Sequence, residues 1–104
     1  MFKDKVVAIT GAASGIGRAL AVETAAQAAR LALADLNLRA LQETVSLLVP
    51  GTSVRAYELD VSSRDAVFGF ADSVQRDFGA AHFIVNNAGT ATLATFEHVT
   101  LEEM

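Results

Sequence analysis

The stretch Ile9-Thr10-Gly11-Ala12-Ala13-Ser14-Gly15-Ile16-Gly17 decides the fold of this chain. The apolar run 6–9 leads into it, and the helix-forming run 18–29 follows it. A strand, a glycine turn and a helix in this order form a phosphate-binding unit, because glycine lets the backbone approach a pyrophosphate and the helix N-terminus offers free N–H groups. The spacing is G-x-x-x-G-x-G, which is wider than G-x-G-x-x-G. Since a glycine turn can also simply close a loop, the rest of the chain has to support this interpretation.

The composition is that of a globular protein. The 104 residues allow one domain, 52% of them are hydrophobic and 19% are charged. The net charge of −4, without a basic run, argues against nucleic acid or an anionic membrane as partner. There is no cysteine, and His82 and His98 lack metal-ligand spacing, so we expect no metal. The apolar runs are too short to span a membrane and no signal peptide opens the chain, which predicts a cytoplasmic protein.

Short apolar runs alternate with amphipathic ones along the chain. The amphipathic runs predict helices over 15–28, from a cap at Asn37 to a stop at Pro50-Gly51, and from a capping box at Ser62 and Asp65 to Gly79. Thr100 with Glu103 resembles another capping box, which predicts the start of a further helix. The predicted strands cover 5–10, 31–34, 53–59 and 83–85.

This alternation predicts an α/β fold with a parallel sheet and helices on both faces. With the first strand central, the strand order is 3-2-1-4, the first half of a Rossmann-like, doubly wound nucleotide-binding fold. The fourth strand reads as a buried one, yet we find nothing to cover its outer edge. The chain also stops where a helix begins. We therefore expect residues 1–104 to be one NAD(P)-binding domain, truncated before a second half.

Acidic side chains follow the second and third predicted strands. Asp35 lies eighteen residues after Gly17, close to the interval at which a carboxylate accepts the adenosine ribose hydroxyls and repels a 2′-phosphate. This favours NAD over NADP. Asp60 ends the third strand at the same edge and is placed to accept from the adenine amino group, with Val61 supporting the ring. Both aspartates are equally suited to a helix cap, which remains the alternative.

The segment Asn86-Asn87-Ala88-Gly89 ends the fourth predicted strand. Paired amides at the end of a buried strand need hydrogen-bond partners, because unpaired polar groups are costly to bury. At this edge they can brace neighbouring backbone, while Ala88 and Gly89 leave room for a flat ligand. A purely structural turn is the other interpretation.

Together these motifs resemble the short-chain dehydrogenase/reductase family over nearly the whole chain: T-G-x-x-x-G-x-G at 10–17, the acidic Asp35, D-V at 60–61 and N-N-A-G at 86–89. The resemblance implies an oxidoreductase that transfers hydride between NAD(H) and a carbonyl or alcohol substrate, with Thr10 and Asn86 holding the sheet edge together. It also implies a homo-oligomer when the protein is complete. The implied cofactor-binding residues are Gly11, Ser14, Gly15, Ile16 and Gly17 at the pyrophosphate, Asp35 at the ribose, Asp60 and Val61 at the adenine, and Asn87, Ala88 and Gly89 at the nicotinamide ribose.

Two positions depart from the family pattern, which usually has glycine where this chain has Ala28-Ala29 and aspartate where it has His82. The family's catalytic serine and its Y-x-x-x-K pair would follow residue 104. The only tyrosine, Tyr57, lies inside a predicted strand, and the two lysines precede the first strand. No catalytic residue is therefore assigned, and we expect these 104 residues alone to be inactive.

The sequence leaves three alternatives to a dehydrogenase open. One is a non-catalytic dinucleotide-binding module, and another is a structural fragment that must associate. A methyltransferase shares the glycine turn and the acidic strand end, but the wider glycine spacing and the segment 86–89 count against it.

Overall fold

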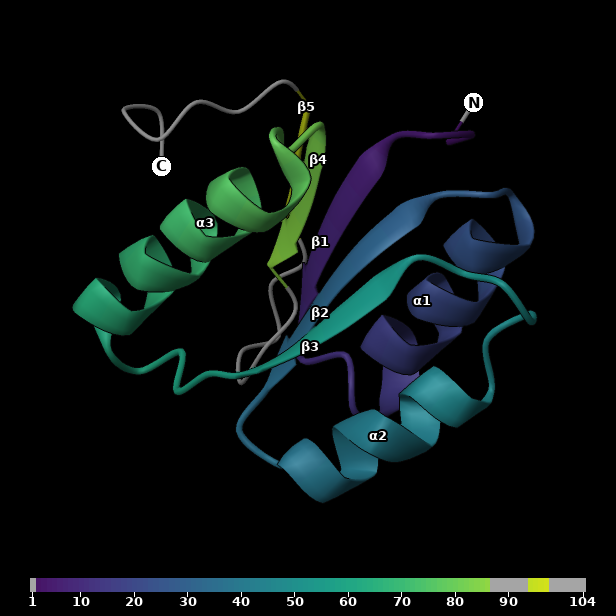
Figure 1. The fold of residues 1–104 in the computed structure, drawn as a ribbon. Helices are drawn as coiled ribbons and strands as arrows, with labels where there is room; N and C mark the ends of the chain where they lie inside the picture. Colours follow the sequence, from purple (N-terminus) through teal and green to yellow (C-terminus); the bar gives the residue numbers. More distant parts are fainter. Residues whose placement is uncertain (1, 87–93, 98–104) are drawn as a thin grey trace.

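The fold of the computed structural model is a twisted sheet with helices on both faces (Figure 1). The structure describes residues 2–86 and 94–97. In the figure α1 and α2 cover one face and α3 covers the other. In chain order the elements are β1 (Val6–Thr10), α1 (Gly15–Ala26), β2 (Arg30–Asp35), α2 (Leu38–Ser46), β3 (Val54–Glu58), α3 (Arg64–Phe78), β4 (Phe83–Asn86) and β5 (Ala94–Glu97).

The order of the strands is β3-β2-β1-β4-β5. Strands β1 to β4 are parallel, which confirms the predicted order 3-2-1-4. The expectation that the outer edge of β4 is uncovered is wrong, because β5 pairs with it in antiparallel orientation, Ile84 opposite Phe96. The segment 94–97 contains a β-branched and an aromatic residue, which favour a strand, but this signal is too short to stand out within a polar loop.

The core consists of two layers, one on each face of the sheet. Every residue of β1 is buried, as expected for a central parallel strand. Successive side chains of a strand point to opposite faces, so β1 contributes Val7 and Ile9 to the layer under α1 and α2, and Val6 and Ala8 to the layer under α3. Within the described residues, no helix has both the length and the apolar character needed to cross a bilayer.

Two helices end earlier than the sequence predicts. Helix α2 stops at Ser46, four residues before Pro50, because the N–H groups of Leu47 and Leu48 bond three residues back, to Thr44 O and Val45 O. This tighter turn replaces the last part of the α-helix. Helix α1 stops at Ala26, and Ala28 then adopts a left-handed φ of +64° that leads into β2.

The cap of α3 also differs from the prediction. Ser63, not Ser62, is the N-cap, and its hydroxyl accepts from the Ala66 N–H. Ser62 is engaged elsewhere, since its N–H and its hydroxyl both donate to Asp60 Oδ1, at 2.9 and 2.6 Å. The C-terminal prediction is confirmed: Gly79 closes α3 at φ +78°.

Candidate functional site

The glycine turn between β1 and α1 is folded tightly onto the first turn of the helix. Gly11 and Gly15 have φ values of +67° and +56°, which disfavour any other residue. A Cβ atom on Gly17 would lie 2.1 Å from Gly11 O and 2.7 Å from Gly11 C. Gly17 is therefore required for this close approach of two backbone segments.

The N-terminus of α1 is open to solvent. Ser14 is its N-cap, but the Ser14 side chain makes no capping hydrogen bond, and no acidic residue occupies the first turn. By contrast, α2 and α3 are capped by Asn37 and Ser63. Ser14, Gly15 and Ile16 are exposed. The unpaired N–H groups and the positive dipole end of α1 together suit an anion.

Three hydrogen bonds from β2 and α2 hold the turn in place. The Ala12 N–H donates to Ala34 O at 3.1 Å, and the Ala13 N–H donates to Asp35 Oδ2 at 3.0 Å. The Thr44 hydroxyl of α2 donates to Ala12 O at 2.8 Å. The sequence did not single out Thr44 as a site residue. The signal that could have done so is its position, a polar residue among the apolar positions of its helix.

Asp35 lies at the carboxyl end of β2, beside the glycine turn. Its second oxygen, Oδ1, accepts from the Asn37 N–H at 2.9 Å. The N-cap of α2 is Asn37, whose Oδ1 accepts from the Ala40 N–H at 3.0 Å, so Asp35 is not itself the cap. The carboxylate is half-buried and held in one orientation by two backbone donors. It thus adds a fixed negative group to the edge at which α1 begins.

The carboxyl ends of β1 and β4 are joined by side chains. Thr10 Oγ1 lies 3.0 Å from Asn86 Oδ1 and 3.5 Å from Val85 O. This contact agrees with the expectation that Thr10 and Asn86 hold the sheet edge together. The predicted cofactor residues Asn87, Ala88 and Gly89 lie outside the described residues.

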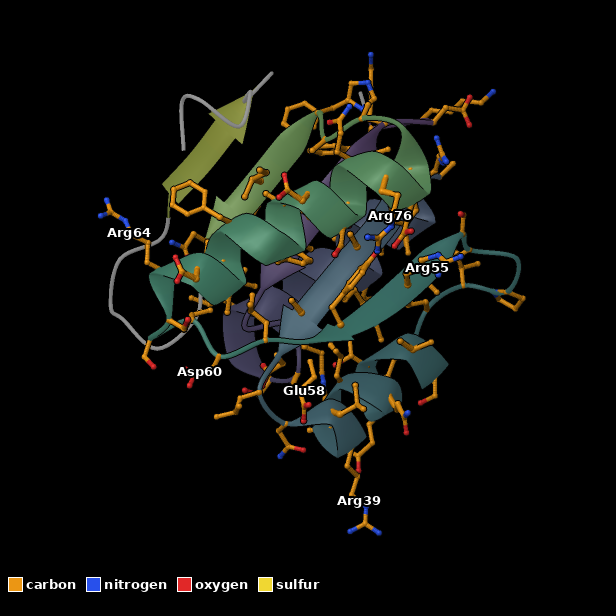
Figure 2. The ribbon with its side chains drawn as sticks, turned by 60° about the vertical axis from the view of Figure 1, so that its left-hand side comes forward. Arg39, Arg55, Glu58, Asp60, Arg64 and Arg76 are labelled. Atoms are coloured by element: carbon orange, nitrogen blue, oxygen red, sulfur yellow. The ribbon has the colours of Figure 1, made fainter. Side chains whose placement is uncertain are left out.

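Asp60 follows β3 on the exterior of the molecule (Figure 2). The hydroxyl of Ser62, and then its N–H, lower the pKa of the Asp60 carboxyl, because both donate to the charged form. Val61 is half-buried and packs against the apolar layer under α3. The structure therefore anchors Asp60 through the loop into α3 and leaves it accessible.

The hydroxyl of Tyr57, in β3, donates to Asp77 Oδ2 of α3 at 2.8 Å. Burial, followed by this hydrogen bond and the charge of Asp77, raises the pKa of Tyr57 to about 12. The charges of Arg55 and Arg76, both labelled in Figure 2, partly oppose that shift. The same hydrogen bond lowers the pKa of Asp77.

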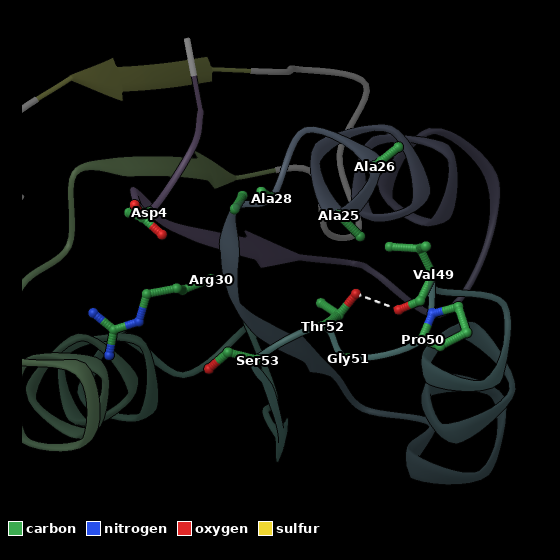
Figure 3. A pocket seen from close by; sticks show the side chains of 11 residues that line it. Asp4, Ala25, Ala26, Ala28, Arg30, Val49, Pro50, Gly51, Thr52 and Ser53 are labelled. Atoms are coloured by element: carbon green, nitrogen blue, oxygen red, sulfur yellow. Dashed lines mark hydrogen bonds between the residues drawn. The ribbon is translucent and has the colours of Figure 1, made fainter.

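A cavity of about 460 Å³ lies at the opposite edge of the sheet (Figure 3). Asp4, Arg30 and Ser53 line it, at the amino ends of β1, β2 and β3. Thr52 donates to Val49 O beside it, at 2.6 Å. Because ligands of open α/β sheets bind at the carboxyl edge, this cavity is separate from the candidate site. In the part of the chain that the structure describes, no group of three acidic or histidine side chains could hold a metal.

Comparison with known proteins agrees with this geometry. The family model for short chain dehydrogenases matches residues 5–104, and the chain belongs to this family of NAD(P)-dependent oxidoreductases. The protein named oxidoreductase SadH, from Mycobacterium tuberculosis, is 47% identical over 91 residues, which are 86% of this chain and 33% of that protein.

Two solved structures share the fold at high similarity. A xylitol dehydrogenase with NAD⁺ bound has a TM-score of 0.80 and 43% identity, over 86% of this chain and 35% of its own. A metagenomic short-chain oxidoreductase in complex with NADP has a TM-score of 0.78 and 30% identity, over 86% and 41%. The chain thus spans about a third of the length of the relatives that it matches. The neighbours bind one or the other nicotinamide dinucleotide.

Proposed function

We propose that this chain forms the cofactor-binding half of an NAD-dependent dehydrogenase that interconverts a small alcohol and a carbonyl compound. The observation that carries the proposal is the open N-terminus of α1 beside the fixed carboxylate of Asp35. Both lie at one edge of the sheet, on the neighbouring strands β1 and β2. Bound NAD supplies the hydride donor or acceptor of the reaction.

The residues of the turn take the pyrophosphate. The N–H groups around Ser14, Gly15 and Ile16 face solvent at the positive end of the helix dipole. Gly11 and Gly17 allow the backbone to fold closely enough to present them. The residues present therefore fit the pyrophosphate group.

Asp35 determines the choice between NAD and NADP in this proposal. Its carboxylate accepts from the ribose hydroxyls of NAD and repels the 2′-phosphate of NADP. Asp60 and Val61 contact the adenine, and residues 87–89 lie along the nicotinamide ribose. The proposal extends to a homo-oligomeric complete protein in the cytoplasm.

The choice of cofactor is tested by calorimetric titration of the protein with NAD⁺ and NADP⁺. We expect NAD⁺ to bind more tightly. Asp35→Asn removes the charge but also weakens the hydrogen bond to the turn. Because both dinucleotides use the turn equally, the ratio of the two Kd values isolates the effect of the charge.

The ratio of NADP⁺ to NAD⁺ Kd values should fall by roughly tenfold in Asp35→Asn, since about 1.4 kcal/mol of charge repulsion is removed. An unchanged ratio, with both ligands weakened, would show that Asp35 only braces the turn. Failure of the unsubstituted protein to bind either dinucleotide would contradict the proposed function itself.

A further inference from the structure

Thr44 connects α2 to the glycine turn although it lies outside the glycine motif. Its side chain is fully buried, and its hydroxyl donates to Ala12 O at 2.8 Å. Ala12 is also fully buried, and its N–H is already bonded to Ala34 O. A buried carbonyl oxygen without a partner is costly, so the hydroxyl of Thr44 stabilises this position of the turn.

Arg18 determines the direction in which the Thr44 hydroxyl points. Arg18 Nε donates to Thr44 Oγ1 at 2.8 Å, and Nη2 donates to Ala40 O at 3.0 Å. Since guanidinium nitrogen can only donate, Thr44 Oγ1 must accept from it and direct its own hydrogen elsewhere. Ala12 O at 2.8 Å is a better acceptor for that hydrogen than Ala40 O at 3.5 Å, which Arg18 already occupies.

We propose that Thr44 is a positioning residue for dinucleotide binding, and that Arg18 acts through the Thr44 hydroxyl rather than as a charge on the ligand. The relay runs from Arg18 in the first turns of α1, through Thr44 on α2, to Ala12 in the turn. The relay fixes the backbone at Ala12, and the residues that follow Ala12 in the turn present N–H groups to the pyrophosphate. The inference rests on the proposed function and extends the site to a second helix.

The first test compares three threonine variants by calorimetric titration with NAD⁺. Thr44→Val removes the hydroxyl and keeps the shape, while Thr44→Ser retains the hydroxyl. Thr24→Val is the matched control, because Thr24 is also buried but its hydroxyl bonds only within α1, to Leu20 O at 2.7 Å. Thermal unfolding of each variant identifies a temperature at which all of them are folded.

We expect Thr44→Val to weaken NAD⁺ binding roughly fivefold to tenfold, the effect of one hydrogen bond. Thr44→Ser and Thr24→Val should stay within twofold of the unsubstituted protein. The conservative serine thus rescues binding, which a general loss of packing would not predict. Unchanged affinity in Thr44→Val, in a protein that binds NAD⁺, would overturn the inference and leave the proposed function intact.

The second test separates the two roles of Arg18 by a double-mutant cycle. Arg18→Lys keeps the positive charge but loses the planar pair of donors. If Arg18 acts through Thr44, Arg18→Lys weakens binding about threefold alone and adds nothing to Thr44→Val. Full additivity, or full binding by Arg18→Lys, would overturn the relay. Absence of NAD⁺ binding by the unsubstituted protein would overturn the proposed function together with this inference.

Discussion

Substitution of Gly17 by alanine tests the tight folding of the turn onto α1. The added Cβ would lie 2.1 Å from Gly11 O, 2.7 Å from Gly11 C and 3.0 Å from Ala12 Cα. All three neighbours are backbone atoms, so no side chain can rotate away and the turn itself must move. Overpacking of a close contact costs about 1–3 kcal/mol. With a contact this short we expect the upper end of that range.

The helix preference of alanine partly offsets this cost. Gly17 lies in α1, where replacing glycine by alanine gains at most about 1 kcal/mol. The net result is a loss of about 2 kcal/mol in the free energy of unfolding. Gly69→Ala is the matched control, because Gly69 lies inside α3 and a Cβ there meets nothing within 4 Å. That variant should gain about 0.5–1 kcal/mol.

The assay is urea unfolding followed by circular dichroism, with NAD⁺ titration of each folded variant. We predict that Gly17→Ala unfolds at lower urea than the unsubstituted protein and binds NAD⁺ at least tenfold more weakly, an effect of about 1.4 kcal/mol on binding. Gly69→Ala should unfold at higher urea with unchanged affinity. If the two variants behave alike, the reasoning from the close contact is wrong.

Two further predictions concern residues away from the turn. Tyr57 is the only tyrosine and there is no tryptophan, so its absorbance titration should give a midpoint near pH 12 that falls in Asp77→Asn. Because the pKa of Tyr57 in the folded protein lies above the usual value near 10, the contribution of Tyr57 to the free energy of unfolding is complete below pH 10 and lost by about pH 12. Urea midpoints that stay level between these two pH values would contradict this prediction. Ala28→Gly should raise the free energy of unfolding by about 0.5–1 kcal/mol, since alanine is strained at φ +64°. Ala29 is buried but has no positive φ, so the control Ala29→Gly should lower the free energy of unfolding. Equal effects of the two substitutions would refute the strain argument.

The sequence predicted those features that depend on local patterns. The continuous apolar run of β1 and the glycine turn after it placed this strand at the centre of the sheet, as observed. The same glycine turn and Asp35 placed the candidate site at the carboxyl edge, where the structure brings Ala13 and Asp35 into contact.

Individual hydrogen bonds between distant segments, outside the recognised motifs, were not predictable. Thr44 and Ala12 are 32 residues apart, and nothing in either segment specifies their hydrogen bond. Strand β5 has only four residues, and its pairing with the edge of β4 is what identifies it as a strand. Local competition accounts for the cap of α3, where Asp60 binds Ser62 and leaves Ser63 to cap the helix.

The two departures from the usual family sequence have distinct structural consequences. Ala28 occupies a left-handed conformation that glycine would adopt without strain. His82 immediately precedes β4. Its side-chain Nδ1 accepts from the Val6 N–H at 2.9 Å, and its backbone N–H donates to Val6 O at 3.0 Å. A histidine at this position thus ties β4 to the beginning of β1.

The measurement that tests the central claim most directly is a titration of ¹⁵N-labelled protein with NAD⁺, followed by amide chemical shifts. We predict the largest shift changes at Gly15, Ile16 and Gly17, where the N-terminus of α1 is open. Gly51 lines the cavity at the opposite edge and should not shift. Saturable changes at Gly51 with none at Gly15 to Gly17 would contradict the claim that this turn binds the dinucleotide.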